Sequence, residues 1–264
     1  MTALARSVPL HPSAARVIGA LVGRDLRRFF RQPSRVVGSV AHPLILWAVL
    51  GAGFADSFRA AAGGANYLAY FLPGTIVLAM LFTAIFSTMS VIDDRHHGFL
   101  QAVLVAPVSR PALVLGKTLG GVTIALVQAV AFVLLAPLAG FSLATMNLPL
   151  VLAALALAAL GFTALGFAAA WWIDSTQGYH GLMSVALIPL WMLSGAMFPA
   201  AGSQGWVRVL MRLDPMTYAV SAVRRGLTGA LDAAGGSMVV DLSVTAVFAV
   251  LAIGLAVVVC QRRP

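Results

Sequence analysis

The sequence contains few charged residues, a single cysteine and no glutamate. Charged residues make up 9% of the 264 positions and hydrophobic residues 61%, against about 25% and 45–50% in an ordinary soluble domain. Because a soluble protein of this length could not hide so much apolar surface, the composition excludes an ordinary soluble fold and indicates a membrane protein. With one cysteine, Cys260, an internal disulfide is impossible.

Long apolar runs separated by short polar connections fill most of the chain. Each run is long enough to cross a bilayer as a helix, so we expect an all-α membrane protein with six transmembrane helices. The length suits one membrane domain, residues 1–264, without a second globular domain. Pro137 and Pro189 lie inside runs and predict kinks. The predicted spans are residues 36–54, 67–91, 111–140, 148–172, 180–198 and 238–260.

Residues 14–34 predict an amphipathic helix that does not span the membrane. Apolar residues recur there at helical spacing, and arginines occupy much of the remaining surface. Such a helix lies in the membrane interface. A solvated basic tail is the alternative, which the regular apolar spacing disfavours. The residues that we expect to characterise this interfacial helix are Arg24, Arg27, Arg28, Phe29 and Phe30.

The distribution of positive charge predicts the orientation in the cell inner (plasma) membrane. Twelve Arg and Lys residues lie on the side that holds both termini and five on the other side, so both termini are expected in the cytoplasm. The arginines flank apolar spans and form no stripe on a soluble domain, which favours membrane lipid over nucleic acid as their partner. Four of the five exoplasmic arginines lie in the connection of residues 200–237.

The connection of residues 200–237 contains two amphipathic stretches around Trp206 and Tyr218. Aromatic residues of this kind are typical of membrane–water interfaces. We expect a helical segment that either enters the outer leaflet as a re-entrant hairpin or lies flat on it. A soluble exoplasmic loop is the third possibility.

The connection between the second and third spans, residues 93–110, opens with charged residues and continues through Gly98 into a short apolar helix. A short helix across the cytoplasmic face is what a transporter needs to contact a soluble motor. Any tight cytoplasmic turn would have a similar composition, so composition alone leaves both interpretations open.

The order of residues in this connection resembles that of ABC-2 type transporter permeases, a family that includes exporters associated with drug resistance and with lipo-oligosaccharides or polysaccharides. The pattern acid-Arg-x-x-Gly-x-Leu begins at Asp94, and Pro-Val-Ser-Arg (107–110) and Gly-Lys (116–117) follow. The family commonly has glutamate where this chain has Asp94.

A second stretch resembles the same family. It comprises Leu-Ser-Gly-Ala-Met-Phe-Pro (193–199), Trp206, Asp-Pro-Met-Thr-Tyr (214–218) and an arginine at 224 or 225. A proline that often precedes the tryptophan in the family is absent here. The interfacial helix and the six-span layout also match, so the resemblance covers nearly the whole chain.

The resemblance implies a permease that pairs with a second copy or a paralogue. Each half of this dimer would dock one ATP-binding cassette subunit, two copies in all. ATP and Mg would be bound by that subunit, and this chain would hold no cofactor. Residues 95–106 would form the coupling helix, seated in a groove of the ATP-binding subunit, and helix 14–34 would face the same subunit. The residues implied in coupling are Asp94, Arg95, Gly98, Phe99, Leu100, Val103, Leu104 and Pro107.

The chain carries no convincing nucleotide-binding or catalytic motif. Gly116-Lys117-Thr118 resembles the end of a P-loop, but Pro111 stands at the position of the first glycine. Lys117 is therefore predicted to be an interfacial charge whose ammonium reaches towards water. The spans show no Ser/His/Asp set, paired carboxylates or metal-binding set, so we expect a permease that is not an enzyme.

The predicted spans also lack the acidic residues that proton or sodium coupling needs near the midplane. This disfavours an ion-coupled secondary transporter, the alternative from another functional class. It favours a path of low polarity for a hydrophobic, drug-like or lipid-like substrate, exported from the cytoplasm or inner leaflet. A glycan or lipid-linked glycan is the second substrate class. The candidate path residues are Phe82, Phe86, Gln128 and Trp191, although aromatic residues in spans more often pack or face lipid.

Overall fold

The computed structural model describes residues 13–61, 66–106, 108–228 and 237–262, and every element of regular structure in these ranges is a helix. Within these ranges, six helical stretches are long and apolar enough to cross a membrane. This confirms the predicted all-α class and the predicted number of spans. They are α2 (Pro33–Gly53), α4 (Tyr67–Ser87) with α5 (Met89–His96), α7 (Arg110–Val133), α8 (Leu148–Trp172), α9 (Thr176–Trp191) with the π-helical turn η2 (Met192–Ala196), and α12 (Met238–Arg262).

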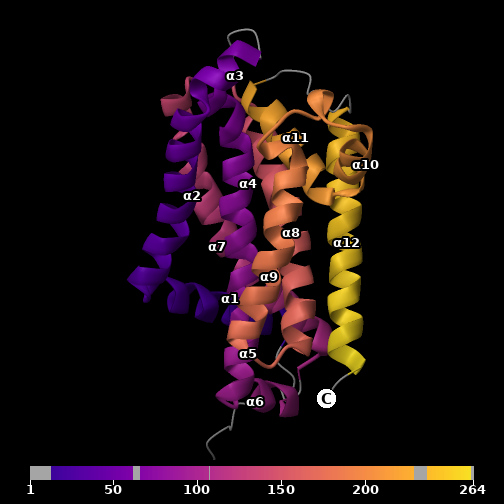
Figure 1. Ribbon diagram of the computed structural model, residues 1–264. Coiled ribbons are helices and arrows are strands. Elements are labelled where there is room, and N and C mark those ends of the chain that lie inside the picture. The colour runs from indigo at the N-terminus through magenta and orange to yellow at the C-terminus, as the bar shows by residue number, and fades with distance from the viewer. Residues whose placement is uncertain (1–12, 62–65, 107, 229–236, 263–264) are drawn as a thin grey trace, which may run out of the picture.

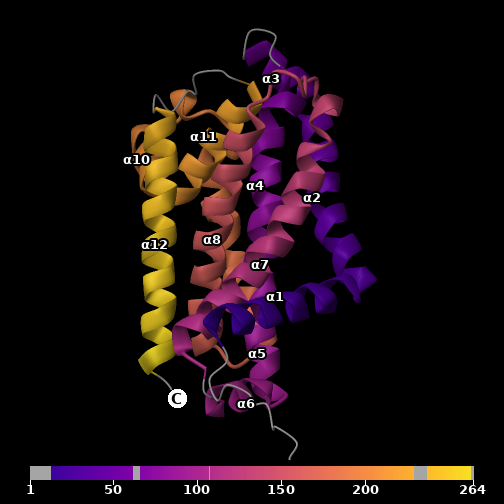
Figure 2. The same cartoon turned by 180° about the vertical axis from the view of Figure 1, so that it is seen from behind.

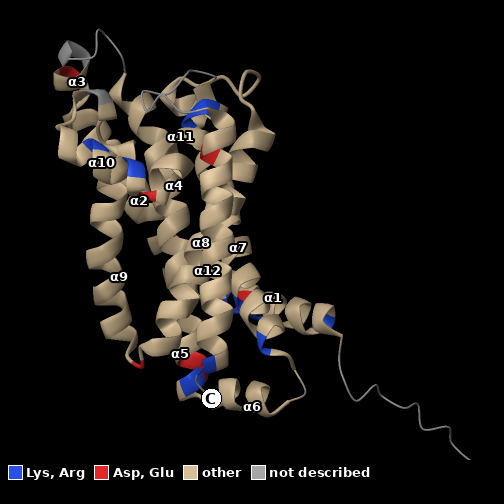
Figure 3. Cartoon of the chain, turned by 90° about the vertical axis from the view of Figure 1, so that its right-hand side faces the viewer, with Lys and Arg blue, Asp and Glu red and all other residues tan. Residues whose placement is uncertain are grey.

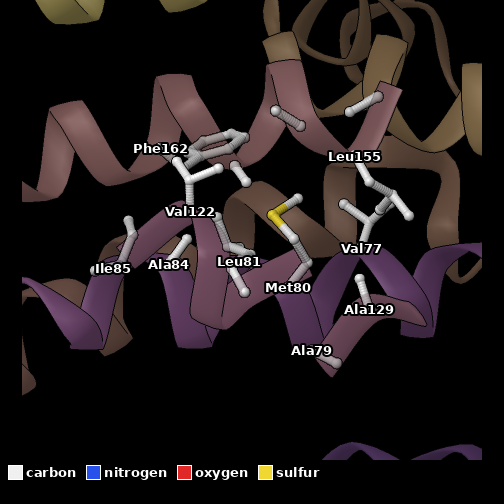
Figure 4. Packing of buried hydrophobic residues seen from close by; sticks show 14 of the residues in the cluster. Val77, Ala79, Met80, Leu81, Ala84, Ile85, Val122, Ala129, Leu155 and Phe162 are labelled. Carbon is white, nitrogen blue, oxygen red and sulfur yellow. The ribbon is translucent and has the colours of Figure 1, made fainter. Parts of the chain in front are cut away.

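The spans form an elongated bundle with α4 in its interior (Figures 1 and 2). Every residue of α4 from Phe71 to Leu81 is buried. Figure 4 shows side chains of α4 such as Met80 and Leu81 against Val122 of α7 and Phe162 of α8. These residues belong to the hydrophobic core of the described chain.

Glycines let the central helices approach closely. A Cβ atom on Gly121 of α7 would lie 2.3 Å from the Ser87 hydroxyl and 2.6 Å from Thr163 of α8. A Cβ atom on Gly161 would lie 2.6 Å from the ring of Phe248 of α12. Small residues at these positions increase the van der Waals contact between helices, which is the main source of helix association in a bilayer.

The outer helices keep wide apolar faces exposed. In the most apolar 18-residue stretch of each span, only 17% of the residues are buried in α2, 33% in α9 and 28% in α12. Because such faces would be unfavourable in water, they are suited to lipid or to another membrane subunit. The exposed apolar residues include Val37, Ile45 and Val49 of α2, Leu182, Val185 and Ile188 of α9, and Val247, Val250 and Leu251 of α12.

Two short helices lie across one end of the bundle. The helix α1 (Ala14–Phe30) lies across the spans, and α6 (Phe99–Val105) lies beyond it, below α5 (Figures 1 and 2). We call this the α6 end. The opposite end carries α3 (Ala55–Ala61), α10 (Gly205–Leu213) and α11 (Pro215–Thr228). In Figure 3 the charged residues gather towards the two ends and leave the middle of the visible helices without charge.

The connection of residues 200–237 is largely helical where it is described. Ten of the fourteen residues of α11 are buried, and this helix packs against α8 and α12. By contrast, α10 buries only Met211 and exposes Trp206, Val209 and Leu213. The two amphipathic stretches therefore differ: α11 belongs to the bundle, and α10 lies at its side (Figure 1).

The two prolines that predicted kinks, Pro137 and Pro189, lie in different surroundings. The run predicted to continue to residue 140 ends as α7 at Val133, and Pro137 lies in a following 3-10 turn, Ala136–Ala139. Proline has no N–H to donate and cannot continue a helix, so it falls after the helix and does not kink it. The second proline, Pro189, does lie inside α9, three residues before the π-helical turn in which Gly195 has a φ of 75°.

Candidate functional site

A buried cluster of charged side chains joins the helices at the α6 end. Lys117 of α7 lies at its centre, with Nζ 2.5 Å from Asp94 Oδ2 and 3.1 Å from Asp25 Oδ1. The side chains of Lys117 and Asp94 are each only 2% exposed. Lys117 was predicted to reach towards water, and this prediction is wrong: its ammonium points inward because two carboxylates replace its hydration shell.

The arginines of α1 complete this cluster. Arg24 donates to both carboxylate oxygens of Asp94, at 2.8 and 2.5 Å, and its guanidinium lies 3.7 Å from the centre of the Phe99 ring. Arg28 donates to Asp93 at 2.8 Å and to Asp94 at 3.5 Å. Six residues from three helices thus form one network, which we call the charge cluster: Arg24, Asp25 and Arg28 of α1, Asp93 and Asp94 of α5, and Lys117 of α7.

The ionisation of the α1 residues reflects this environment. The hydrogen bond to Asp94 raises the pKa of Arg24, so this guanidinium stays charged. Burial raises the pKa of Asp25 above its ordinary value, and the nearby Lys117 opposes this shift. The ionised form of Asp25 therefore depends on Lys117.

A pair of glycines explains why α1 can settle on α7. A Cβ atom on Gly116 would lie 2.7 Å from Leu21 Cδ1, and one on Gly120 would lie 3.3 Å from Asp25 Cβ. These glycines are four residues apart and share one face of α7. The Gly-x-x-x-Gly face thus packs against α1 and places Asp25 beside Lys117.

The short helix α6 packs its predicted coupling residues against the bundle and exposes other residues. Gly98, with a φ of 75°, turns the chain from α5 into α6. Leu100 is 4% exposed, and Phe99, Val103 and Leu104 are partly buried against the core. The outward face consists of Gln101, Ala102 and Val105, of which Val105 is 88% exposed. Pro107 lies outside the described residues.

Arg95, another predicted coupling residue, holds the C-terminal end of α8. Its guanidinium donates to the carbonyl oxygens of Trp171 at 2.7 Å and Ile173 at 3.4 Å, and it forms an ion pair with Asp174. A cation at this position satisfies the last carbonyls of a helix and interacts favourably with the helix dipole. Asp94 and Arg95 therefore both bind neighbouring helices of this chain.

Two of the four candidate path residues form buried polar contacts between spans. The side chain of Gln128 accepts a hydrogen bond from Thr83 of α4 and donates one to the carbonyl of Ser39 of α2. The indole of Trp191 donates to the carbonyl of Gly74 at 2.9 Å. Both are buried, so in this conformation they connect helices.

Phe82 and Phe86 lie on the side of α4 that α2 and α9 flank, and both are half-buried. The centroid of the Phe82 ring is 6.4 Å from that of His42 of α2 and 5.5 Å from that of Phe86. Phe86 stacks on His180 of α9 at 4.6 Å. We call these four rings the aromatic strip: His42, Phe82, Phe86 and His180.

Two arginines at the opposite end have partners inside the protein. Arg225 of α11 lies 3.0 Å from Asp241 of α12. Arg224 donates to the carbonyl of Gly195 at 2.9 Å, and its guanidinium lies 4.4 Å from the centre of the Tyr70 ring. These contacts account for two arginines on a side where the charge distribution predicted few.

Sequence reasoning did not single out Asp25 and Tyr179. Asp25 is the one acid within the arginine-rich helix, which is the signal that could have identified it. Tyr179 is fully buried, and its hydroxyl bonds to Thr88 and to the carbonyl of Gly166. It lies at the edge of an apolar run, where no pattern distinguishes it.

Comparison with known proteins shows the family of the chain. The family model described as ABC-2 type transporter matches residues 16–228. The daunorubicin resistance ABC transporter permease protein DrrB1 of Streptomyces coeruleorubidus is 28% identical over 241 residues, 88% of this chain and 83% of the relative. Nodulation protein J of Sinorhizobium fredii is 27% identical over 233 residues, 86% of each chain. Permeases of this family have no catalytic activity of their own, and the ATPase of the exporter is a separate subunit. The chain therefore belongs to the ABC-2 type transporter family, as a permease subunit of an ABC exporter.

Proposed function

We propose that this permease exports a hydrophobic, drug-like or lipid-like substrate as part of a pair of permeases, and that one ATP-binding subunit docks at the α6 end of each, two copies in all. This end would face the cytoplasm, together with both termini. The observation that carries the proposal is the charge cluster, because it joins the segment before α6 to both α1 and α7. The outward face of α6 would sit in a groove of the ATP-binding subunit, and Phe99, Leu100, Val103 and Leu104 would hold α6 in place.

The connections of α6 suggest how a movement reaches the spans. α5 follows α4 after a single residue, Thr88, and α1 leads into α2 through Arg31 and Gln32. A displacement of α6 would therefore act on α4 directly, on α7 through Lys117, and on α2 through α1. ATP binding on the partner would favour one membrane conformation by binding it more tightly than the other.

The aromatic strip is the proposed substrate path. A second copy, or a paralogue, would pack against the exposed faces of α2 and α9, and the strip would then face the space between two permeases. Two phenylalanines and two histidines offer stacking surfaces and little polarity, which suits a planar hydrophobic molecule. The name of the relative DrrB1, a daunorubicin resistance permease, supports a drug-like substrate.

A glycan or lipid-linked glycan is the alternative cargo. It would need hydrogen-bonding groups along the path, and Gln128 and Trp191 would have to leave their present partners to supply them.

At the opposite end, α11 would enter the outer leaflet as a re-entrant helix, and α10 would lie flat on the membrane. The exposure of Trp206 on α10 supports this placement, because exposed tryptophans are typical of membrane–water interfaces.

The docking proposal is tested by placing a charge on the outward face of α6. Val105→Asp should lower permease-stimulated ATPase activity in the reconstituted complex at least about tenfold, because a carboxylate would enter an apolar protein contact. Val209→Asp on α10 is the matched control, since Val209 is also exposed, and it should leave the stimulation unchanged. Full stimulation with Val105→Asp, at normal membrane insertion, would contradict the docking of α6.

A further inference from the structure

A hollow of about 540 Å³ lies along the last two turns of α1. Its lining residues are Arg24, Arg27, Arg28, Arg31 and Gln32. We propose that this hollow, which we call the arginine pocket, binds the phosphate-bearing headgroup of an anionic phospholipid. The lipid would be a bound structural ligand, distinct from the transported substrate.

The charges around the arginine pocket are not balanced. Arg24 and Arg28 form ion pairs with Asp94 and Asp93. Arg27 donates through Nε to the carbonyl of Gly23 at 3.0 Å. Among the described residues, neither Arg27 nor Arg31 forms an ion pair with a carboxylate.

Counting the charge cluster and the pocket together shows the size of this excess. Five cations, namely the four arginines and Lys117, face three carboxylates. Two positive charges are left over. Both belong to exposed arginines four residues apart, Arg27 in the last turn of α1 and Arg31 at its C-cap. Two guanidinium groups at this spacing can bind one phosphate between them, because the planar fork of arginine matches the phosphate oxygens.

The position of the pocket favours a lipid over a soluble anion. Only Arg31 and Gln32 separate α1 from Pro33, the first residue of α2, so the pocket lies where the chain enters the first span. This is the level of the lipid headgroups. Phe29 and Phe30 pack edge to face at 5.4 Å beside these arginines, and Phe30 is 52% exposed. An exposed aromatic ring next to the pocket provides a contact for the acyl chain region.

The pocket can be removed without touching the charge cluster. Arg27→Gln/Arg31→Gln removes both unpaired charges and keeps every ion pair of Arg24 and Arg28. Arg208→Gln/Arg212→Gln on α10 is the matched control, because it removes two arginines with the same spacing from an amphipathic helix at the opposite end. In detergent micelles that contain phosphatidylcholine, both variants should have melting temperatures close to that of the unmodified protein, since neither breaks an ion pair of the described residues.

The measurement is lipid binding by native mass spectrometry. It is combined with melting temperatures in detergent micelles that contain either phosphatidylglycerol or phosphatidylcholine. The unmodified protein and the α10 control should retain phosphatidylglycerol in preference to phosphatidylcholine and should be stabilised by it. In the α1 variant, the ratio of the affinity for phosphatidylglycerol to that for phosphatidylcholine should fall at least about tenfold, equivalent to about 1.4 kcal/mol. Arg27→Lys/Arg31→Lys, which keeps the charge, should lose only part of it.

Three results would overturn the proposal. The first is an unchanged lipid preference in Arg27→Gln/Arg31→Gln. The second is equal stabilisation of the unmodified protein by inorganic phosphate in pure phosphatidylcholine, which would assign the pocket to a small soluble anion. The third is a variant that keeps its lipid preference and no longer retains the ATP-binding subunit, which would assign the pocket to a protein contact.

Discussion

At the scale of single residues, the position of Lys117 decides how the α6 end is held together. Its ammonium bridges Asp25 of α1 and Asp94 of α5, and it is almost fully buried. A buried ion pair contributes little net stability compared with an apolar core, but the loss of one partner leaves an uncompensated charge. The charge cluster therefore penalises any conformation in which one of these helices separates from the other two.

Removal of the ammonium tests this role of Lys117. Lys117→Met, of similar length, should destabilise the protein by about 3–5 kcal/mol, because Asp25 loses its buried partner. The double variant Lys117→Met/Asp25→Asn should recover part of this loss, since the orphaned charge is then absent. Thermal melting in detergent measures both effects. A single variant that melts like the unmodified protein, or a double variant without recovery, would contradict the proposed role.

A second prediction at this scale concerns Asp214, between α10 and α11. Burial raises its pKa to about 7, although its carboxylate accepts a hydrogen bond from the Met216 N–H at 2.8 Å. An unfolded aspartate has a pKa of about 3.9. Between these values the folded state binds the extra proton, so this contribution to stability is complete at low pH and is lost as the pH rises to about 7.

Asp214→Asn removes this titration and keeps an oxygen that can accept from Met216. Between pH 5 and pH 8, the melting temperature of the unmodified protein should fall by several degrees relative to that of Asp214→Asn, because about 1 kcal/mol corresponds to roughly 2–4 °C in a protein of this size. The difference between the two proteins at each pH cancels the titration of other groups. Parallel melting curves across this range would show that Asp214 is ionised when folded.

At the scale of helices, the packing of α1 against Gly116 and Gly120 of α7 determines the geometry of the α6 end. The two glycines on α7 are spaced in the sequence as close helix packing requires, but this spacing does not identify the partner. Residues alone could not show that the partner is α1, because an amphipathic helix in the interface and a neighbouring span would both fit a small-residue face. The same limit applies to Asp94 and Arg95, which the resemblance implied in coupling and which also bind neighbouring helices of this chain.

Blocking this seat should release α1. Gly116→Leu would place a side chain where Leu21 now lies, since even a Cβ atom there is 2.7 Å from Leu21 Cδ1. The expected result is a lower melting temperature together with faster proteolysis within α1. Gly254→Leu on α12 is the control, because nothing lies within 4 Å of a Cβ at that position. If both variants behave alike, the Gly-x-x-x-Gly face does not seat α1.

At the scale of the whole molecule, the apolar runs predicted the number of spans because each run must satisfy its own backbone inside a bilayer. Interior positions were harder to predict. α4 is buried all round and α2 is not, although both are apolar helices of 21 residues. Hydropathy measures transfer out of water and does not distinguish lipid from protein as the new surroundings. For the same reason Gln128 and Trp191 were predicted to line a path, and both contact other spans.

The most direct test of ATPase docking at the α6 end is site-specific photo-cross-linking in the assembled transporter. The only native cysteine is first removed by Cys260→Ala, and a cysteine-reactive photo-cross-linker is then attached at Val105→Cys in α6 or at Val209→Cys in α10. Mass spectrometry of the products should identify the ATP-binding subunit cross-linked to position 105 and not to position 209. Cross-linking of that subunit to position 209 alone, with none at position 105, would contradict both the docking surface and the proposed orientation of the bundle.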